Sequence, residues 1–403
     1  MIARAPYLFL LLILVPDLYL DRHYWRHRLS PGKRFVYWLP SIILVAITLI
    51  LTYEKSFIPD NPTLLYIYLL LLGLIAIPKA VFMLCSITGL ACSKLLHRKK
   101  GTKGKNYGNL LGMLFVPVIW YILLYGVFVG FNKLEVNYQE YASPDLPKAF
   151  DGYKIVLFSD VHAGSYTERN QYVLQKAIDS INAQHPDLIV FTGDIQNTQP
   201  QDLYRHMDVL STLRAKDGIY SVLGNHDYGD YICGNTARKV ANCRETMSLE
   251  KQLGWTLLMN AHHVIDRKGS HIIIAGMEND GDGIRFPQKG DIRKTLKGVS
   301  TPLPHREETG VRSPFILMLE HDPSAWRRKI IPDGRAQLTL SGHTHKMQFS
   351  LFGWCPMTIT GKEVSGWYQE GNQSLFVTAG LGGLIPFRFG ATGEIVVLTL
   401  RAH

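Results

Sequence analysis

The sequence has few cysteines and few charged residues for its length. Five cysteines in 403 residues are too few to staple a chain of this size with disulfides, and 35 glycines with 20 prolines give no collagen-like excess. Charged residues make up only 19% against 47% hydrophobic residues, which excludes an intrinsically disordered chain. Because ordinary domains have ~100–200 residues, a chain of 403 residues predicts two or three units.

Long apolar runs are nearly absent after residue 131. Before it, four runs predict membrane-spanning helices, because a bilayer core of ~30 Å needs about 20 apolar residues in a helix; they are roughly 5–20, 35–53, 64–93 and 108–131. The first run is short and carries Asp17, but no small-residue cleavage site follows it, so a retained anchor is favoured over a secretory signal. The third run predicts one long helix with Lys79 inside it. Lys79 either snorkels to an interface or points into the bundle, where an ionisable group can mark a functional site.

Positive charge is concentrated in two segments between these runs. Residues 21–34 carry five basic residues, and residues 94–105 carry six with no acidic residue. Both segments should face the cytoplasm, so with four spans the N-terminus and everything beyond about residue 131 lie on the extracytoplasmic side. The two segments explain part of the net charge of +10, and no nucleic-acid surface is expected. The prediction is a transmembrane domain at 1–131, a linker at 132–150 and a globular domain at 151–403.

Beyond residue 150, short β-rich apolar runs first alternate with helical stretches and later follow one another. The expected strands are 154–158, 188–191, 219–223, 272–275, 315–319, 337–340, 375–378 and 394–400, with helices near 170–181 and 203–213. This order predicts an α/β sandwich of two packed sheets with helices outside. Cys233 and Cys243, ten residues apart, are either a disulfide of an oxidising compartment or two unrelated thiols.

Polar residues that would be costly in a core come directly after five of the expected strands. The segments are Ser159-Asp160-Val161-His162, Thr192-Gly193-Asp194, Gly224-Asn225-His226-Asp227, Glu320-His321-Asp322 and Ser341-Gly342-His343-Thr344-His345. The 34 residues from Asp160 to Asp194 and the 31 from Asp194 to Asn225 are each about one βαβ unit, which brings the carboxyl ends of parallel strands side by side. Open α/β sheets bind their ligands in the crevice at those ends.

Carboxylates, an amide oxygen and several imidazoles around one crevice form a mixed nitrogen and oxygen site. Such a site suits Mn, Fe, Zn, Ni or Co better than Ca or Mg. The Asp-x-His alternation lets residues 160 and 162 point the same way from an extended segment, and the same holds for residues 343 and 345. Gly193, Gly224 and Gly342 would let the backbone approach the ions closely.

The ordered set DVH, GD, GNHD, EHD and GHTH resembles the calcineurin-like metallophosphoesterase superfamily, over roughly residues 135–403. The segments Gly380–Gly383 and Pro386–Gly390 resemble its YkuE- or YaeI-like branch of small bacterial and membrane-tethered enzymes. The resemblance implies a four-layer α-β-β-α sandwich and two divalent metal ions, with Mn, Fe or Zn as candidates. It assigns one ion to Asp160, His162 and His345, the other to Asn225, His321 and His343, and makes Asp194 their bridge.

The same resemblance gives His226 contact with the substrate phosphate and assistance to the leaving group. The ions would supply a bridging hydroxide for in-line attack on phosphorus, with Asp227 as an orienting partner of His226. Where many relatives continue GHTHGGQ, Lys346 and Met347 stand here in place of the two glycines, which bears on pocket width and substrate choice. Arg388 either binds a substrate phosphate or pairs on the surface.

Three functions remain open at this point. The first is a membrane-anchored phosphoesterase, by resemblance a phosphodiesterase, which acts outside the cytoplasm on a lipid-linked or cell-envelope phosphate ester. The second is a hydrolase of the UDP-2,3-diacylglucosamine pyrophosphate type from lipid A synthesis, which requires the cytoplasmic face. The third is a membrane protein whose phosphoesterase domain only binds a ligand, although a domain of that kind has no need of His226. The sequence predicts no particular oligomeric state.

Overall fold

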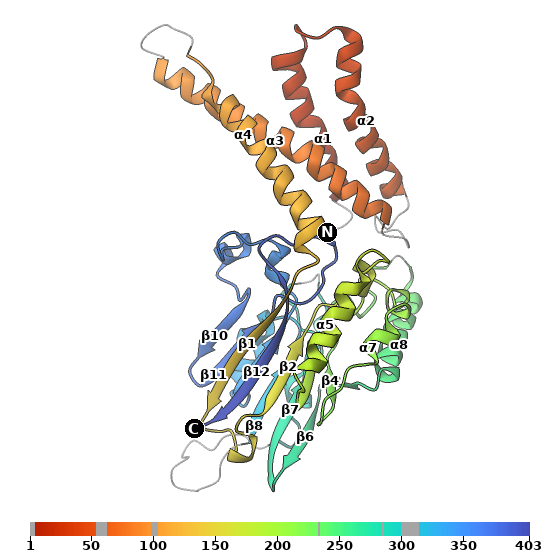
Figure 1. Cartoon of the computed structure of the whole chain (residues 1–403), viewed down its shortest axis with the longest axis vertical. Coiled ribbons are helices and arrows are strands. Elements are labelled where there is room, and N and C mark those ends of the chain that lie inside the picture. Colours follow the sequence, from red (N-terminus) through yellow and green to blue (C-terminus); the bar gives the residue numbers. More distant parts are fainter. Residues whose placement is uncertain (1–4, 54–62, 98–103, 233, 284–285, 300–313) are drawn as a thin grey trace. The chain divides into compact units, whose positions relative to one another are not determined.

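The computed structural model describes residues 5–53, 63–97, 104–232, 234–283, 286–299 and 314–403. The chain divides into two compact units, Met1–Phe128 and Val129–His403 (Figure 1). Cys233 lies outside the described residues, so a disulfide with Cys243 and two unrelated thiols both stay predictions.

In the described part of the N-terminal unit, all regular secondary structure is helical. Its helices are α1 (Ala5–Leu20), continued by a π-helical turn (Asp21–Trp25), α2 (Pro31–Tyr53), α3 (Thr63–His97) and α4 (Tyr107–Tyr125). Three helical segments are long and apolar enough to cross a membrane: Pro31–Thr52, Thr63–Leu96 and Tyr107–Gly130. The 16 residues of α1 rise only ~24 Å, less than a bilayer core, so the fourth span stays a prediction.

Lys79 points into the helical bundle. Its Nζ lies 2.7 Å from Asp17 Oδ1 of α1 and donates a hydrogen bond of 3.1 Å to Ser41 Oγ of α2. The Tyr37 hydroxyl donates to the same Asp17 oxygen at 2.6 Å. Snorkelling of Lys79 to an interface is therefore wrong, because a buried carboxylate on a neighbouring helix holds the ammonium group inside the bundle.

The C-terminal unit contains two six-stranded sheets (Figure 1). The first has the order β1 (Leu134–Ser143), β12 (Gly393–Ala402), β2 (Lys154–Phe158), β3 (Leu188–Phe191), β4 (Ile219–Ser221) and β5 (Thr256–Leu257). The second has the order β10 (Gly366–Glu370), β11 (Gln373–Val377), β9 (Leu338–Ser341), β8 (Phe315–Leu319), β7 (Ser270–Gly276) and β6 (Ala261–Arg267). The central strands β2–β3–β4 are parallel, as are β7–β8–β9, so their carboxyl ends meet at one edge of each sheet.

Helices cover the outer faces of the two sheets. On the first sheet they are α5 (Gln171–Ala183), α6 (Gln201–Tyr204), α7 (Met207–Leu210) and α8 (Thr236–Gln252), and near the second are α9 (Ile292–Thr295), the π-helical turn Trp326–Ile330 and α11 (Ile331–Asp333). One buried apolar cluster joins the first sheet to its helices, a second fills the space between the sheets, and a third lies under Trp326 on the outer face of the second sheet. The predicted four-layer α-β-β-α sandwich is confirmed.

Each strand expected beyond residue 150 is present with boundaries shifted by at most a few residues. Within the segment 132–150, which the sequence predicted as a linker, residues 134–143 form β1, paired in parallel with β12 along its whole length. This strand was missed because its exposed positions alternate with half-buried ones at the edge of the sheet, so it carries no continuous apolar run. Helix α8 was also missed, since its sequence is strongly polar.

Candidate metal centre

The loops that leave five parallel strands deliver the candidate ligands to one place. Asp160 and His162 follow β2, Asp194 follows β3, and Asn225 follows β4; from the other sheet His321 follows β8, and His343 and His345 follow β9. All seven side chains predicted as ligands are thereby brought together at the carboxyl ends of these strands; five are buried, and His343 and His345 are partly buried.

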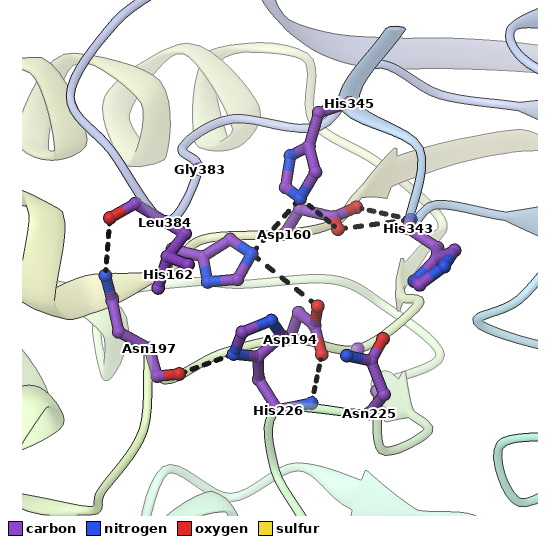
Figure 2. Close-up of polar contacts among 12 residues, drawn as sticks. Asp160, His162, Asp194, Asn197, Asn225, His226, His343, His345, Gly383 and Leu384 are labelled. Carbon is purple, nitrogen blue, oxygen red and sulfur yellow. Dashed lines mark hydrogen bonds and ion pairs between the residues drawn. The ribbon is translucent and has the colours of Figure 1, made fainter. Parts of the chain in front are cut away.

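The first group consists of Asp160, His162, Asp194 and His345, whose candidate ligand atoms all lie within 4.8 Å of one another. His162 Nε2 is 3.2 Å from His345 Nε2 and 3.5 Å from Asp194 Oδ2, and His345 Nε2 is 3.3 Å from Asp160 Oδ1 (Figure 2). Two imidazole nitrogens and two carboxylates therefore converge on one point.

The second group consists of Asp194, His321 and His343, again with ligand atoms within 4.8 Å of one another. His321 Nε2 lies 3.2 Å from Asp194 Oδ2, 3.2 Å from His343 Nδ1 and 3.1 Å from Asn225 Oδ1. Asp194 Oδ2 thus belongs to both groups. The Asn225 amide is oriented by its own Nδ2, which donates to the Tyr231 hydroxyl at 2.8 Å and leaves Oδ1 facing His321.

The donor set fits divalent transition-metal ions. In both groups two imidazole nitrogens lie 3.2 Å apart and next to buried carboxylates. Hydrogen bonds between these side chains leave some of their lone pairs without a partner. A cation between them would accept a lone pair from every member of the group. Nitrogen and oxygen ligands without cysteine suit Mn, Fe or Zn. The residues present therefore match the ions expected for the fold.

Five of the seven candidate ligands have a left-handed backbone, a feature that the sequence did not reveal. The φ angles are +52° at Asp160, +46° at His162, +60° at Asp194, +73° at His343 and +50° at His345. Non-glycine residues in this region carry strain of roughly 1–3 kcal/mol each and persist where the surroundings over-determine them, which is common at functional sites.

The glycines beside the ligands are required for close approach, as the sequence predicted. A Cβ atom at Gly224 would lie 2.1 Å from Asp194 Oδ1, and one at Gly342 would lie 2.3 Å from Asp160 Oδ2. Gly193 has φ +97° and its Cβ would lie 2.4 Å from the Gly224 nitrogen. A side chain at Gly224 or Gly342 would push a carboxylate out of place, and one at Gly193 would displace the Gly224 backbone or the His321 ring.

Burial and mutual charge set the protonation of the site. Burial raises the pKa of Asp160 to about 6 and lowers that of His162 to about 3. For Asp194 the effect of burial is outweighed by His321 and the other nearby imidazoles, which hold its pKa well below the usual range; Asp194 in turn raises the pKa of His321 to about 10. The shared carboxylate is therefore the ionised centre of the cluster.

His226 is oriented by a backbone carbonyl. Its Nδ1 lies 2.5 Å from Asn197 O and must donate to it, while its backbone N–H donates to Asp194 Oδ1 at 2.9 Å (Figure 2). The expected orienting role of Asp227 is wrong. Both Asp227 oxygens accept backbone N–H groups of the loops that carry the ligands, at 2.8 Å from Asp194 N and 2.8 Å from Gly224 N among others, so this carboxylate shapes the loops instead.

Arg388 neither binds substrate nor pairs on the surface, contrary to both alternatives. It is fully buried and donates to the backbone carbonyls of Ala379, Gly380, Gly382, Ala391 and Thr392. This loop contacts the metal centre, because Gly382 N donates to Asp160 O and Leu381 N to Ser159 O. Arg388 therefore fixes the loop behind Asp160.

Lys346 and Met347 keep the backbone that glycines would favour. Their φ angles are +50° and +55°, so the departure from the GHTHGGQ pattern places two side chains on a left-handed backbone of the kind that glycine adopts readily. Gln348 remains in register and donates from Nε2 to the carbonyls of Ile385 and Phe387, at 2.8 and 2.7 Å.

Comparison with known proteins identifies the molecule in two parts. A family model for the calcineurin-like phosphoesterases matches residues 153–347, and a model described as the transmembrane domain of a probable calcineurin-like phosphoesterase matches residues 2–131. With the site described above, these matches define a membrane protein that is a metal-dependent phosphoester hydrolase. The chain belongs to the calcineurin-like metallophosphoesterase family.

Among curated relatives, the uncharacterized metallophosphoesterase YkuE of Bacillus subtilis is 34% identical over 67% of this chain and 87% of its own length. A transmembrane protein with a metallophosphoesterase domain from Danio rerio is 27% identical over 76% of this chain and 67% of its own length. Among solved structures, a dimetal phosphatase from Danio rerio is 11% identical, with a TM-score of 0.36 over 59% of this chain and 89% of that one.

Proposed function

We propose that this chain is an extracytoplasmic phosphodiesterase with two divalent ions. Asp160, His162 and His345 would hold one ion, Asn225, His321 and His343 would hold the other, and Asp194 would be shared between them. The observation that carries the proposal is the position of Asp194 Oδ2, 3.5 Å from His162 Nε2 in one group and 3.2 Å from His321 Nε2 in the other. One oxygen placed between two nitrogen-rich groups suits a carboxylate that bridges a pair of ions.

When bound there, divalent ions polarise the phosphoryl oxygens of an ester and lower the pKa of bound water. His226 supplies the proton for the leaving group. Because its Nδ1–H is committed to Asn197 O, the nitrogen that gains and releases a proton is Nε2. The His226 ring is held from one side by the Tyr231 ring, 4.5 Å away between centroids.

The extracytoplasmic side is supported by the basic segments on either side of α2 and α3. Residues 21–34 precede α2 and residues 94–105 precede α4, so the same side holds both and α4 leads the chain to the opposite side. This argument does not depend on whether α1 crosses the membrane, because α1 changes only the position of the N-terminus. The preference for a diester is supported by the resemblance to the YkuE- and YaeI-like branch.

A second candidate is a pyrophosphate hydrolase acting at the cytoplasmic face. Two relatives named UDP-2,3-diacylglucosamine pyrophosphatase LpxG, from Chlamydia muridarum and Chlamydia trachomatis, are each 25% identical over 72% of this chain and 95% of their own length. This candidate requires the opposite topology. A reporter fused after His403 decides between them: an enzyme active only in an oxidising compartment supports the first, and one active only in the cytoplasm supports the second.

Catalysis is tested with the full chain in nanodiscs, supplied with Mn²⁺ and given bis-p-nitrophenyl phosphate or p-nitrophenyl phosphate. We expect metal-dependent turnover with a preference for the diester. His226→Ala should slow an ester with an alkyl leaving group by ~10²–10⁴-fold and a p-nitrophenyl ester by less, because nitrophenolate needs less help from an acid. His263→Ala, at an exposed position on β6, is the matched control. Turnover that is indifferent to His226→Ala with both esters would refute the assigned role.

A further inference from the structure

Exposed apolar side chains are concentrated in the segment that follows the last candidate ligand. Within the described part of Val129–His403, every exposed Leu, Ile, Met or Phe lies between residues 347 and 359. They are Met347, Leu351, Phe352 and Ile359, with the exposed Trp354 among them; Phe352 is 102% exposed and Ile359 77%. We call this group the apolar loop. An exposed apolar patch of this kind usually marks a surface that binds something.

The tip of the apolar loop is a tight hairpin with an aromatic residue where a small one is preferred. Leu351 and Trp354 exchange backbone hydrogen bonds of 2.8 and 3.0 Å, and the two residues between them, Phe352 and Gly353, have φ +51° and +84°. A turn with two positive φ angles favours Asn-Gly. The Phe352 backbone is strained at this φ angle, and its apolar side chain is fully exposed to water. Because the side chain is fully exposed, packing does not offset the strain.

The base of the apolar loop is fixed to the metal centre. Met347 is two residues after His345, and Gln348 is hydrogen-bonded to the loop of Ile385 and Phe387. Ser350 N donates to Phe389 O at 2.7 Å, and Cys355 is fully buried. The tip therefore extends from a base that is hydrogen-bonded in place next to the last candidate ligand.

Two features indicate a lipid bilayer as the occupant. Only residues 131–133 separate the candidate span Tyr107–Gly130 from β1, so the catalytic unit is tethered within about 10 Å of chain to the membrane. Of the three basic residues between 334 and 362, Arg335 is paired with Asp333 and Lys362 with Asp282, which leaves Lys346, at the base of the apolar loop, to complement anionic phosphate head groups. Aromatic and aliphatic side chains next to basic ones are typical of segments that bind membrane interfaces.

We propose that the apolar loop inserts into the interface of the bilayer and presents the metal centre to phosphate esters carried by lipids. Phe352 and Trp354 enter the apolar boundary, where their exposure is no longer costly. The substrate class rests on the proposed function, whereas the insertion does not.

Insertion is measured by fluorescence quenching of the full chain in nanodiscs that contain lipids brominated on their acyl chains. If Trp354 is in the lipid, Trp354→Phe removes quenchable emission, and the fraction of emission quenched falls. If Trp354 is in water, the same variant removes emission that the brominated lipids cannot quench. The fraction of emission quenched then rises, and this result would overturn the proposal. Trp367→Phe is the control, because Trp367 is a partly exposed tryptophan of β10 outside the apolar loop, hydrogen-bonded to Gln139. It should raise the fraction quenched.

The consequence for substrates is measured with two esters that share a leaving group. One is soluble bis-p-nitrophenyl phosphate, and the other is the p-nitrophenyl ester of phosphatidic acid in the same nanodiscs. In Phe352→Asp the ratio of lipid-ester turnover to soluble-ester turnover should fall about tenfold, because taking one large apolar side chain out of a lipid phase costs about that factor or more. Tyr172→Asp, an exposed position on α5, should leave the ratio unchanged.

An unchanged ratio in Phe352→Asp would overturn the substrate class. Absence of wild-type turnover with both esters would refute the proposed function, and the quenching result would still decide whether the apolar loop is inserted. The two failures are therefore distinguishable.

Discussion

Replacement of Arg388 by methionine should destabilise the catalytic unit and disturb the metal centre together. The guanidinium is buried and has no carboxylate partner among the described residues; it is stable there because it donates to five backbone carbonyls. Methionine fills a similar volume but removes the guanidinium donor from all five carbonyls, of which Gly380 O still accepts from Glu394 N. At ~1–3 kcal/mol for an unsatisfied buried acceptor, partly offset by entry of water and by removal of a buried charge, we expect a net loss of about 3 kcal/mol.

For a unit of this size, such a loss lowers the melting temperature by roughly 6–12 °C. The assay is thermal unfolding of the full chain in detergent at one scan rate, followed by a titration of activity against Mn²⁺. Because the loop held by Arg388 contacts Asp160, Arg388→Met should also require more Mn²⁺ for half-maximal activity. Arg388→Lys keeps the charge but cannot reach five carbonyls, and should behave in the same way.

Arg401→Met is the control, since this arginine forms an exposed ion pair with Glu140 and should have little effect on either measurement. An unchanged melting temperature and an unchanged Mn²⁺ requirement in Arg388→Met would refute the reasoning. A different result would restore the alternative in which the positive charge binds the substrate phosphate. In that result Arg388→Lys keeps full activity, and Arg388→Met loses activity without losing stability.

Three further predictions follow from single contacts. Lys79→Met should lower bundle stability by ~3–5 kcal/mol, measured by unfolding in detergent, because it leaves the buried Asp17 carboxylate without its counter-ion; adding Asp17→Asn should recover much of the loss. Gly224→Ala should abolish metal-dependent turnover, since its Cβ would lie 2.1 Å from Asp194 Oδ1. Burial raises the pKa of the Glu250 carboxyl well above its usual range, so Glu250→Gln should raise the melting temperature more at pH 8 than at pH 5.

Each of these predictions has a contradicting result. A double variant Asp17→Asn/Lys79→Met less stable than Lys79→Met would show that the pair does not carry the effect. Gly32→Ala, at a glycine with open space around its Cβ position, should keep turnover, and Gly224→Ala with wild-type turnover would refute the steric argument. For Glu250, the folded state holds a proton that the unfolded state releases, so wild-type stability falls as pH rises above the usual carboxyl pKa; an effect of Glu250→Gln that is independent of pH would refute this.

Most of the metal centre was predictable because the signal for each ligand lies within a short stretch of sequence. Each ligand directly follows a recognisable apolar strand, and parallel strands bring such positions together at one edge. The left-handed backbone at Asp160 or His345 was not predictable, because a non-glycine residue rarely adopts a positive φ angle and its identity does not indicate where it does. The partner of His226 was missed because a backbone carbonyl, that of Asn197, leaves no signature in the sequence.

Long-range pairs were the other features that the sequence did not reveal. Lys79 and Asp17 lie in different helices, and only packing of the bundle decides whether a lysine meets a carboxylate or an interface. Strand β1 was hidden because it completes the sheet edge through β12, more than 250 residues away in sequence. Arg388 could not be assigned from its neighbours, since its partners are main-chain atoms of a folded loop.

The most direct test of the central claim is the metal content of the purified full chain after loading with Mn²⁺ and removal of free ions. Two ions per chain are expected for the wild type, and Asp194→Ala should weaken both, because its carboxylate belongs to both groups of ligands. His162→Ala should weaken one ion only. A wild-type content of one ion, or an Asp194→Ala variant that retains two at unchanged affinity, would contradict the bridged pair.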